Sequence, residues 1–191
     1  MGASNGGSLV YTDDNVSSYS SIFDNTVLKT TGEDDYKRVI EALKALSEGK
    51  DLEKYFDVDE ILRYLAVHTT VVNLDSYVSN MQQNYYIYEK DSKITILPWD
   101  YNLAFGGFQA GSAASAVNFP VDTPVSGVKL SERPLIAKLL EVDEYKEKYH
   151  DHTACTFFGQ FYTNHHVYLW CVCYAIWNTY SARRFGYAGY E

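Results

Sequence analysis

Two aspartates and one asparagine near the middle of the chain have the residue types and the spacing that phosphoryl transfer requires. Asp75 and Asn80 lie five positions apart, and Asp100 follows further along the chain. Phosphoryl transfer needs one carboxylate to accept the proton of the attacking hydroxyl, and oxygen ligands to hold Mg²⁺ against the nucleotide phosphates. Our hypothesis therefore gives proton acceptance to Asp75 and a Mg²⁺ site to Asp100 and Asn80.

The order of these residues is that of protein kinases. There, a catalytic-loop Asp is followed five residues later by a metal-binding Asn, then by a β-hairpin and a second metal-binding Asp. The usual His-Arg-Asp and Asp-Phe-Gly triplets are absent, because residues 73–75 read Asn-Leu-Asp and residues 99–101 read Trp-Asp-Tyr. A purely structural alternative stays open, in which Asp75 ends a helix, Asn80 forms an Asx turn and Asp100 caps the segment after the hairpin.

Two predicted helices precede the motif, and a predicted hairpin lies inside it. The first helix occupies residues 31–49, with apolar residues at helical spacing and a terminating glycine. The second begins at Asp57, where Glu60 completes a capping box. Residues 85–89 and 93–97 are β-prone runs separated by a short polar turn. Asp100, the candidate metal-binding aspartate, therefore lies just beyond the end of the second strand.

The remaining segments complete an α+β prediction. Residues 1–30 are expected to be irregular, and residues 106–131, rich in Gly, Ala, Ser and Pro, predict a long loop of the kind that covers active sites. Short helices are predicted over 134–140 and from 143 to about 150. The expected fold is mainly helical, with one β-hairpin between the catalytic loop and the metal-binding Asp.

Several runs of residues around the motif resemble the spore coat CotH kinase family. The most specific are the Pro-Trp-Asp element of residues 98–100 and the Asn-Tyr-Tyr start of the first strand. The resemblance extends over residues 8–150. The runs that carry it are 64–68 (Tyr-Leu-Ala-Val-His), 72–77 (Val-Asn-Leu-Asp-Ser-Tyr), Asn80, 84–89 (Asn-Tyr-Tyr-Ile-Tyr-Glu) and 97–106 (Leu-Pro-Trp-Asp-Tyr-Asn-Leu-Ala-Phe-Gly).

This resemblance implies an atypical protein kinase with ATP and Mg²⁺ as cofactors. It implies transfer of phosphate to Ser of spore coat proteins, or of surface proteins in other bacteria, and hence a location in the spore coat or at the cell surface. Asp75 matches the family's catalytic-loop Asp and Asp100 its metal-binding Asp, with Asn80 as the second metal ligand. Asn84 and Asn102 match family positions near the site, which makes them candidate cofactor-binding residues, although Asn84 could equally anchor the hairpin.

Two regions depart from the kinase pattern. Residues 1–30 contain no recognisable Gly-rich phosphate loop or strand lysine, so we expect residues 31–151 to be a C-terminal kinase lobe that is inactive as a fragment. Residues 152–191 hold all three Cys but no Asp or Lys. Such a break is typical of a frameshifted reading frame. A metal site in this tail is a weaker alternative, since the spacing fits no zinc pattern; its candidate ligands are His152, His165, His166, Cys171 and Cys173.

Composition excludes some functions and leaves rivals to the kinase hypothesis. A net charge of -9 argues against nucleic acid as a partner. No stretch reaches the length of a membrane span, and residues 1–11 lack a secretory signal pattern. One rival is a non-catalytic structural or binding component of a spore coat or cell surface. Another rival is metal-dependent hydrolysis by the aspartate pair, which needs a further His or carboxylate nearby. His68 is the one candidate for that residue, although its position in an apolar helical stripe favours a core histidine.

Overall fold

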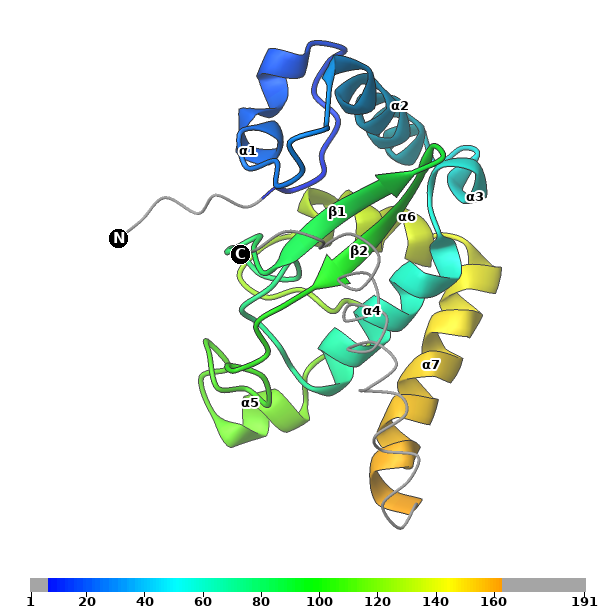
Figure 1. The fold of residues 1–191 in the computed structure, drawn as a ribbon. Coiled ribbons are helices and arrows are strands. Elements are labelled where there is room, and N and C mark those ends of the chain that lie inside the picture. The colour runs from blue at the N-terminus through cyan, green and yellow to red at the C-terminus, as the bar shows by residue number, and fades with distance from the viewer. Residues whose placement is uncertain (1–6, 163–191) are drawn as a thin grey trace, which may run out of the picture.

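Helices gathered around one β-hairpin make up the described chain (Figure 1). The computed structural model describes residues 7–162, with side chains up to Thr156. In chain order the elements are η1 (Val16–Tyr19), α1 (Ser20–Phe23), α2 (Glu33–Glu48), α3 (Leu52–Tyr55), α4 (Val58–Thr70), β1 (Tyr85–Lys90), β2 (Lys93–Pro98), α5 (Ala113–Val117), η2 (Leu130–Glu132), α6 (Pro134–Leu140) and α7 (Asp143–Tyr162). This composition confirms the expected α+β class.

The ends of α2 and α4 follow local sequence signals. Helix α2 ends at Gly49, whose φ of 66° is the left-handed conformation that glycine adopts without strain. Its first turn is held by Asp35, whose carboxylate accepts the N–H of Gly32 at 2.7 Å. At α4, the side chain of Asp57 accepts the N–H of Glu60 at 3.4 Å, which is half of the predicted capping box.

The two strands form an antiparallel hairpin in which Tyr85 pairs with Pro98 and Lys90 with Lys93. Each strand is one residue longer than the sequence pattern predicts. The loop is therefore two residues, Asp91 and Ser92, with φ of 54° and 65°. Positive φ at both positions is the geometry of a type I′ turn, whose twist matches that of the flanking strands.

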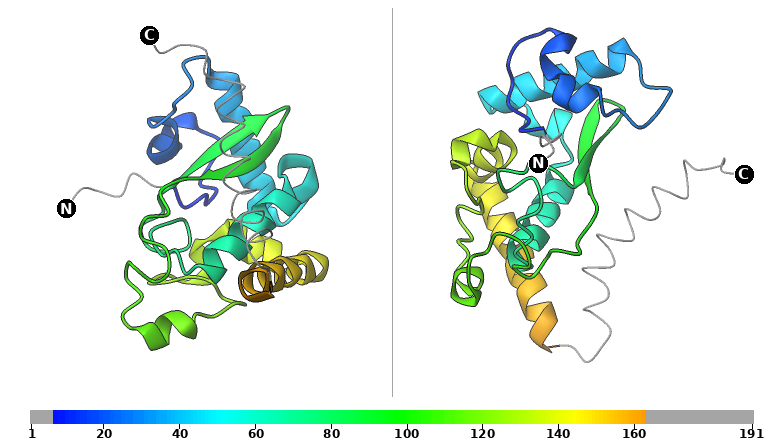
Figure 2. Two further views of the ribbon diagram at one scale, coloured as in Figure 1. Left: turned by 60° about the horizontal axis from the view of Figure 1, so that its bottom comes forward. Right: turned by 90° about the vertical axis from the view of Figure 1, so that its left-hand side faces the viewer.

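The hairpin lies between two groups of helices (Figures 1 and 2). On one side, Arg38 of α2 forms an ion pair with Glu89 of β1 at 3.0 Å. On the other, the N–H of Asp57 donates to the carbonyl of Ile94 at 2.8 Å, and β2 packs against α4. Ile94 and Ile96 are buried in the shared core. The hairpin is thus fixed on both sides, with its open end directed toward the loop that follows α4.

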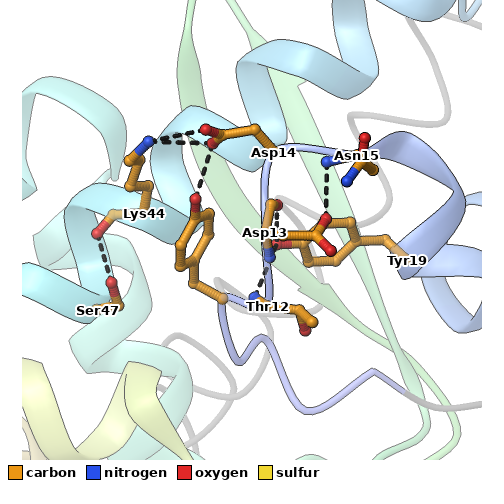
Figure 3. Close-up of polar contacts among 8 residues, drawn as sticks. Thr12, Asp13, Asp14, Asn15, Tyr19, Lys44 and Ser47 are labelled. Atoms are coloured by element: carbon orange, nitrogen blue, oxygen red, sulfur yellow. Dashed lines mark hydrogen bonds and ion pairs between the residues drawn. The ribbon is translucent and has the colours of Figure 1, made fainter.

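The N-terminal segment is irregular apart from the short η1 and α1 turns within it. It is attached to α2 through Asp14, whose carboxylate accepts the Lys44 ammonium at 3.0 and 3.1 Å and the Tyr11 hydroxyl at 2.8 Å (Figure 3). The Tyr19 hydroxyl closes the same segment by donating to the carbonyl of Asp13 at 2.7 Å. These contacts hold an otherwise irregular chain against the core.

Helix α7 is longer than the sequence pattern predicts and continues across the expected boundary between residues 151 and 152. It packs along α4 (Figure 1), where the buried Tyr149 hydroxyl donates to Thr69 at 2.9 Å. Within residues 7–162, no helix combines the length and apolar character that crossing a bilayer requires. Residues 163–191 lie outside the described part of the chain. The hypotheses of a frameshifted tail and of a metal site in it concern mostly these residues.

Candidate active site

The loop between α4 and β1 carries the predicted catalytic residue in a buried position. Asp75 is only 7% exposed. One carboxylate oxygen accepts the side-chain amide of Gln83 at 2.6 Å, and the other accepts that of Asn84 at 2.9 Å. An ionised carboxylate offers about four acceptor positions, so two amide donors leave lone pairs for a further proton donor. Asp75 is thus oriented by its neighbours and retains accepting capacity.

Asp100 lies beside the same neighbour, Asn84, at the open end of the hairpin. The N–H of Trp99 donates to the backbone carbonyl of Asn84 at 3.1 Å, extending the strand pairing by one step. Asp100 follows directly, with a φ of 58° and an exposed side chain. Asn84 therefore contacts the first aspartate through its side chain and the residue next to the second through its backbone.

Asn80 and Asn102 are not drawn into this contact network. Asn80 is exposed, and its side chain lies next to Gly127. It lines a cavity of 580 Å³ together with Gln82, and neither predicted catalytic aspartate is among the lining residues described. Asn102 is also exposed, in the turn that follows Asp100. The structure thus groups Asp75, Asn84 and the Asp100 segment and leaves the two other asparagines at the periphery.

The donor types around Asp100 fit Mg²⁺. Among residues 7–162, the side chains of Asp100, Asn80 and Asn102 have no hydrogen-bond or ion-pair partner, which leaves carboxylate and amide oxygens free for a hard cation. In the same range, no three His, Cys, Asp or Glu side chains lie close enough together to hold a metal ion by themselves. A site with one or two carboxylates is the type that Mg²⁺ occupies together with substrate phosphates and water.

His68 is a buried structural residue that links the two aspartate segments. Its Nδ1–H donates to the carbonyl of Tyr64 at 3.1 Å, and its Nε2 lies 3.4 Å from the amide nitrogen of Asn73, two residues before Asp75. The hydroxyl of Tyr101, the residue after Asp100, lies 3.4 Å from Nδ1. Burial lowers the pKa of His68 to about 4. Because the residue is 0% exposed, its ring has no access to a substrate water and the geometry does not favour a role in hydrolysis.

Backbone contacts fix the segment after Asp100 onto the end of α4. The N–H groups of Phe105 and Gly106 donate to the carbonyls of Val71 and Val72. Val72, Asp100 and Phe105 all have positive φ, at 46°, 58° and 60°. For a β-branched residue such as Val72 this conformation is a genuine outlier that costs of order 1–3 kcal/mol. Strain of this kind clusters at functional sites, and here it shapes both aspartate-bearing turns.

A buried arginine holds the middle of the loop between α4 and β1. The guanidinium of Arg133 donates to the carbonyl of Tyr77 at 2.8 Å and to that of Ser79 through two nitrogens. The Tyr77 hydroxyl accepts the N–H of Leu135 at 3.2 Å and so ties the loop to α6 a second time. Burial lowers the pKa of Arg133. The loop between Asp75 and Asn80 is therefore anchored to the fold.

The sequence predicts the two aspartates as site residues but does not predict several residues that position them. Gln83 lies in a run of polar residues that indicates a site in the sequence. Nothing in the sequence predicts its hydrogen bond to Asp75. The contacts of Arg133 and Tyr101 had no sequence signal, since each joins residues far apart in the chain. His68 was expected to be a core histidine, and its burial agrees with that expectation.

Comparison with known proteins identifies one family. The family described as CotH kinase protein matches residues 3–167. This range includes both aspartates, the hairpin between them and all of the described elements. No curated protein and no solved structure matches the chain.

Proposed function

Because the chain belongs to the CotH kinase protein family, we propose that it performs Mg²⁺-dependent phosphoryl transfer from ATP to a protein serine. A kinase lobe that is inactive as a fragment, which the sequence of residues 1–30 leads us to expect, stays an alternative that the transfer assay decides. The observation that carries this proposal is the position of Asn84 between the two aspartates. Its side-chain amide donates to the carboxylate of Asp75, and its backbone carbonyl accepts the N–H of Trp99, the residue before Asp100. Two carboxylates at the open end of one hairpin supply the parts that this reaction requires.

In this proposal, Asp75 orients the acceptor hydroxyl and takes its proton. Gln83 and Asn84 hold the carboxylate in one orientation, so little ordering remains to be done when the acceptor arrives. General-base assistance of this type contributes roughly 10²–10⁴-fold to the rate. Proton acceptance is thus assigned to the buried aspartate and not to the exposed one.

The exposed side chain of Asp100 would hold the metal. Asn80, the second ligand predicted from the sequence, has no contact with the Asp100 segment in the described part of the chain and is kept as a candidate ligand on the sequence spacing alone. A bound Mg²⁺ neutralises the negative charge of the nucleotide phosphates. Asn102, two residues beyond Asp100, provides a further amide oxygen for the cofactor. The kinase-lobe architecture is likewise part of this proposal: the hairpin stands between the catalytic loop and the metal-binding aspartate, as in protein kinases.

The family also suggests the acceptors, which we propose to be serines of spore coat or surface proteins. A non-catalytic role in a coat or at a surface is the second candidate. One observation favours it: Asp75 is only 7% exposed, and its carboxylate accepts hydrogen bonds from two side-chain amides. In that role the loop would be a structural element, and the two aspartates would take part in no reaction.

A transfer assay separates the two candidates. The chain would be incubated with Mg²⁺, γ-labelled ATP and casein as a serine-containing acceptor, and label on the acceptor and on the chain itself would be counted. The catalytic proposal predicts transfer that is lost in Asp100→Ala and reduced at least ~10²-fold in Asp75→Asn. A folded wild-type chain that neither binds ATP nor transfers label would support the non-catalytic role, whereas one that binds ATP in Mg²⁺ without transferring label would support the inactive fragment.

A further inference from the structure

The buried ring of His68 lies between two aromatic rings, one on its own helix and one beyond Asp100. Its centroid is 4.2 Å from that of Tyr64 and 5.0 Å from that of Tyr101, and the ring planes are tilted by 47° and 52°. A close-packed interior leaves a side chain few orientations. The two neighbouring rings therefore fix the direction in which each nitrogen of His68 points.

The edges of this ring contact both aspartate-bearing turns. Nε2 of His68 lies 3.4 Å from the side-chain nitrogen of Asn73, two residues before Asp75. Nδ1 lies 3.4 Å from the hydroxyl of Tyr101, the residue after Asp100. Both distances are long for hydrogen bonds, so each contact is weak by itself. Together they form a continuous path of side chains from one turn to the other.

The side chain of Asn73 depends on His68 for its orientation. Its amide nitrogen reaches Nε2, whereas its buried Oδ1 has no hydrogen-bond partner in the part of the chain that the structure describes. The backbone carbonyl of Asn73 accepts the hydroxyl of Ser76 at 2.6 Å, and Ser76, the neighbour of Asp75, is 0% exposed. A displacement of the imidazole would therefore reach the residues on both sides of Asp75.

We propose that His68 is a positioning residue that couples the two aspartate-bearing turns through Tyr101 and Asn73. The path keeps the two carboxylates in one relative alignment. The consequence for catalysis rests on the proposed function, because alignment matters only if an acceptor and a phosphate meet between the aspartates. The coupling itself is a property of the folded chain, so it can be measured without any reaction.

Backbone hydrogen bonds offer another explanation for the alignment. The N–H groups of Phe105 and Gly106 donate to carbonyls of residues 71 and 72, so the segment after Asp100 is also attached without the imidazole. These bonds do not involve the side chain of Tyr101. A substitution that removes only the Tyr101 hydroxyl therefore separates the two explanations.

Heteronuclear NMR spectra of the isotope-labelled chain test the coupling directly. Tyr101→Phe removes one end of the path and retains the ring. Tyr86→Phe is the matched control, since Tyr86 is 46% exposed and stacks on Trp99, directly before Asp100. We expect Tyr101→Phe to shift the Asn73 side-chain amide signal, and Tyr86→Phe to leave it in place. In a His68→Leu background, Tyr101→Phe should no longer shift this signal.

Transfer kinetics measure the consequence for alignment. Tyr101→Phe should lower kcat about 10-fold while KM for ATP stays within a few-fold, because misalignment changes the reacting geometry and leaves nucleotide binding intact. Adding Tyr101→Phe to His68→Leu should cause no further loss. A purely structural role would lower stability without this separation of kcat from KM. Circular dichroism would verify that each variant is folded, and if His68→Leu is not, the single variant Tyr101→Phe decides.

The contrary outcomes are distinguishable. An unshifted Asn73 signal in Tyr101→Phe would refute the coupling and leave the backbone bonds as the cause of the alignment. A shift that persists in His68→Leu would show that another contact carries the effect. A shifted signal with unchanged kcat would refute the positioning role. If the wild-type chain transfers no phosphate, the catalytic proposal fails for this chain, while the NMR comparison still decides whether His68 couples the turns.

Discussion

Asn84 donates both hydrogens of its side-chain amide to Asp75, one to the carboxylate at 2.9 Å and one to the backbone carbonyl at 2.7 Å. The donor stands at the entry to β1 with a φ of 61°, a conformation that asparagine tolerates better than most residues. The turn at the strand entry therefore sets the orientation of the candidate catalytic carboxylate.

Asn84→Ala should destabilise the fold by about 2–3 kcal/mol, because it deprives a buried carboxylate of a hydrogen-bond donor and puts alanine in a left-handed conformation. Gln82→Ala is the matched control, with a φ of 54° and no side-chain partner among residues 7–162. Glutamine and alanine both carry a Cβ in that conformation, so the substitution adds little backbone cost and should change the free energy of unfolding by less than about 0.5 kcal/mol. Urea denaturation gives both values. Equal losses in the two variants would mean that the contact with Asp75 contributes nothing measurable.

Asp75→Asn should separate binding from turnover. The substitution retains the shape of the side chain but removes the proton acceptor, so ATP affinity should stay within a few-fold of wild type while transfer falls by roughly 10² or more. Calorimetry and single-turnover transfer measure the two quantities. A parallel loss of both would instead identify Asp75 as a metal ligand or a structural residue.

Stability should fall as the pH drops below neutrality, because His68 is buried in its neutral form. Its pKa is about 4 in the folded chain and about 6.5 when unfolded. Between these values the unfolded state binds more protons, so acidification favours unfolding. The complete shift corresponds to roughly 3 kcal/mol, lost progressively from about pH 6.5 to about pH 4.

Denaturation at a series of pH values would test this against a His68→Gln variant, which cannot titrate but can still accept a hydrogen bond from Asn73. The variant should be less stable at pH 7 and have a flatter pH dependence in this window. If wild type and variant lost stability in parallel, other groups would be responsible for the acid sensitivity.

Arg133→Lys should be far from conservative. The guanidinium reaches the carbonyls of Tyr77 and Ser79 simultaneously, which a single ammonium cannot reproduce. We expect a loss of about 2–4 kcal/mol in the free energy of unfolding, consistent with removing hydrogen bonds made by a buried charged group. Arg63→Lys is the control, since the 2.8 Å ion pair of Arg63 with Asp59 is exposed and should contribute at most about 1 kcal/mol. A similar loss in both variants would show that the loop does not depend on Arg133.

Features with a local cause could be predicted from the sequence, and long-range contacts could not. The glycine at the end of α2 and the N-cap at Asp57 are encoded within a few residues, and both are found, although only half of the predicted capping box is formed. The hairpin was found because strand-forming runs flanked a turn. The links from His68 to Tyr101 and from Arg133 to Ser79 join distant segments, and only tertiary packing determines them.

The candidate site shows the same division. The order of Asp75 and Asp100 around a hairpin is visible in the chain, as is the polar run before β1. The left-handed conformation of Val72 is not, since valine disfavours it and only the surrounding structure imposes it. The burial of Asp75 and the exposure of Asn80 likewise follow from the tertiary fold.

The central claim is that Asp100 holds Mg²⁺ for phosphoryl transfer, and the Mg²⁺ dependence of ATP binding tests it most directly. ATP would be titrated into wild type, Asp100→Ala and Asp91→Ala across a range of Mg²⁺ concentrations, with transfer measured in parallel. Asp91 is the matched control, an exposed aspartate with a φ of 54° at the far end of the hairpin. We predict Mg²⁺-dependent ATP binding and transfer in wild type and Asp91→Ala, and the loss of both in Asp100→Ala. Binding and transfer by Asp100→Ala within a few-fold of wild type at saturating Mg²⁺ would contradict the account.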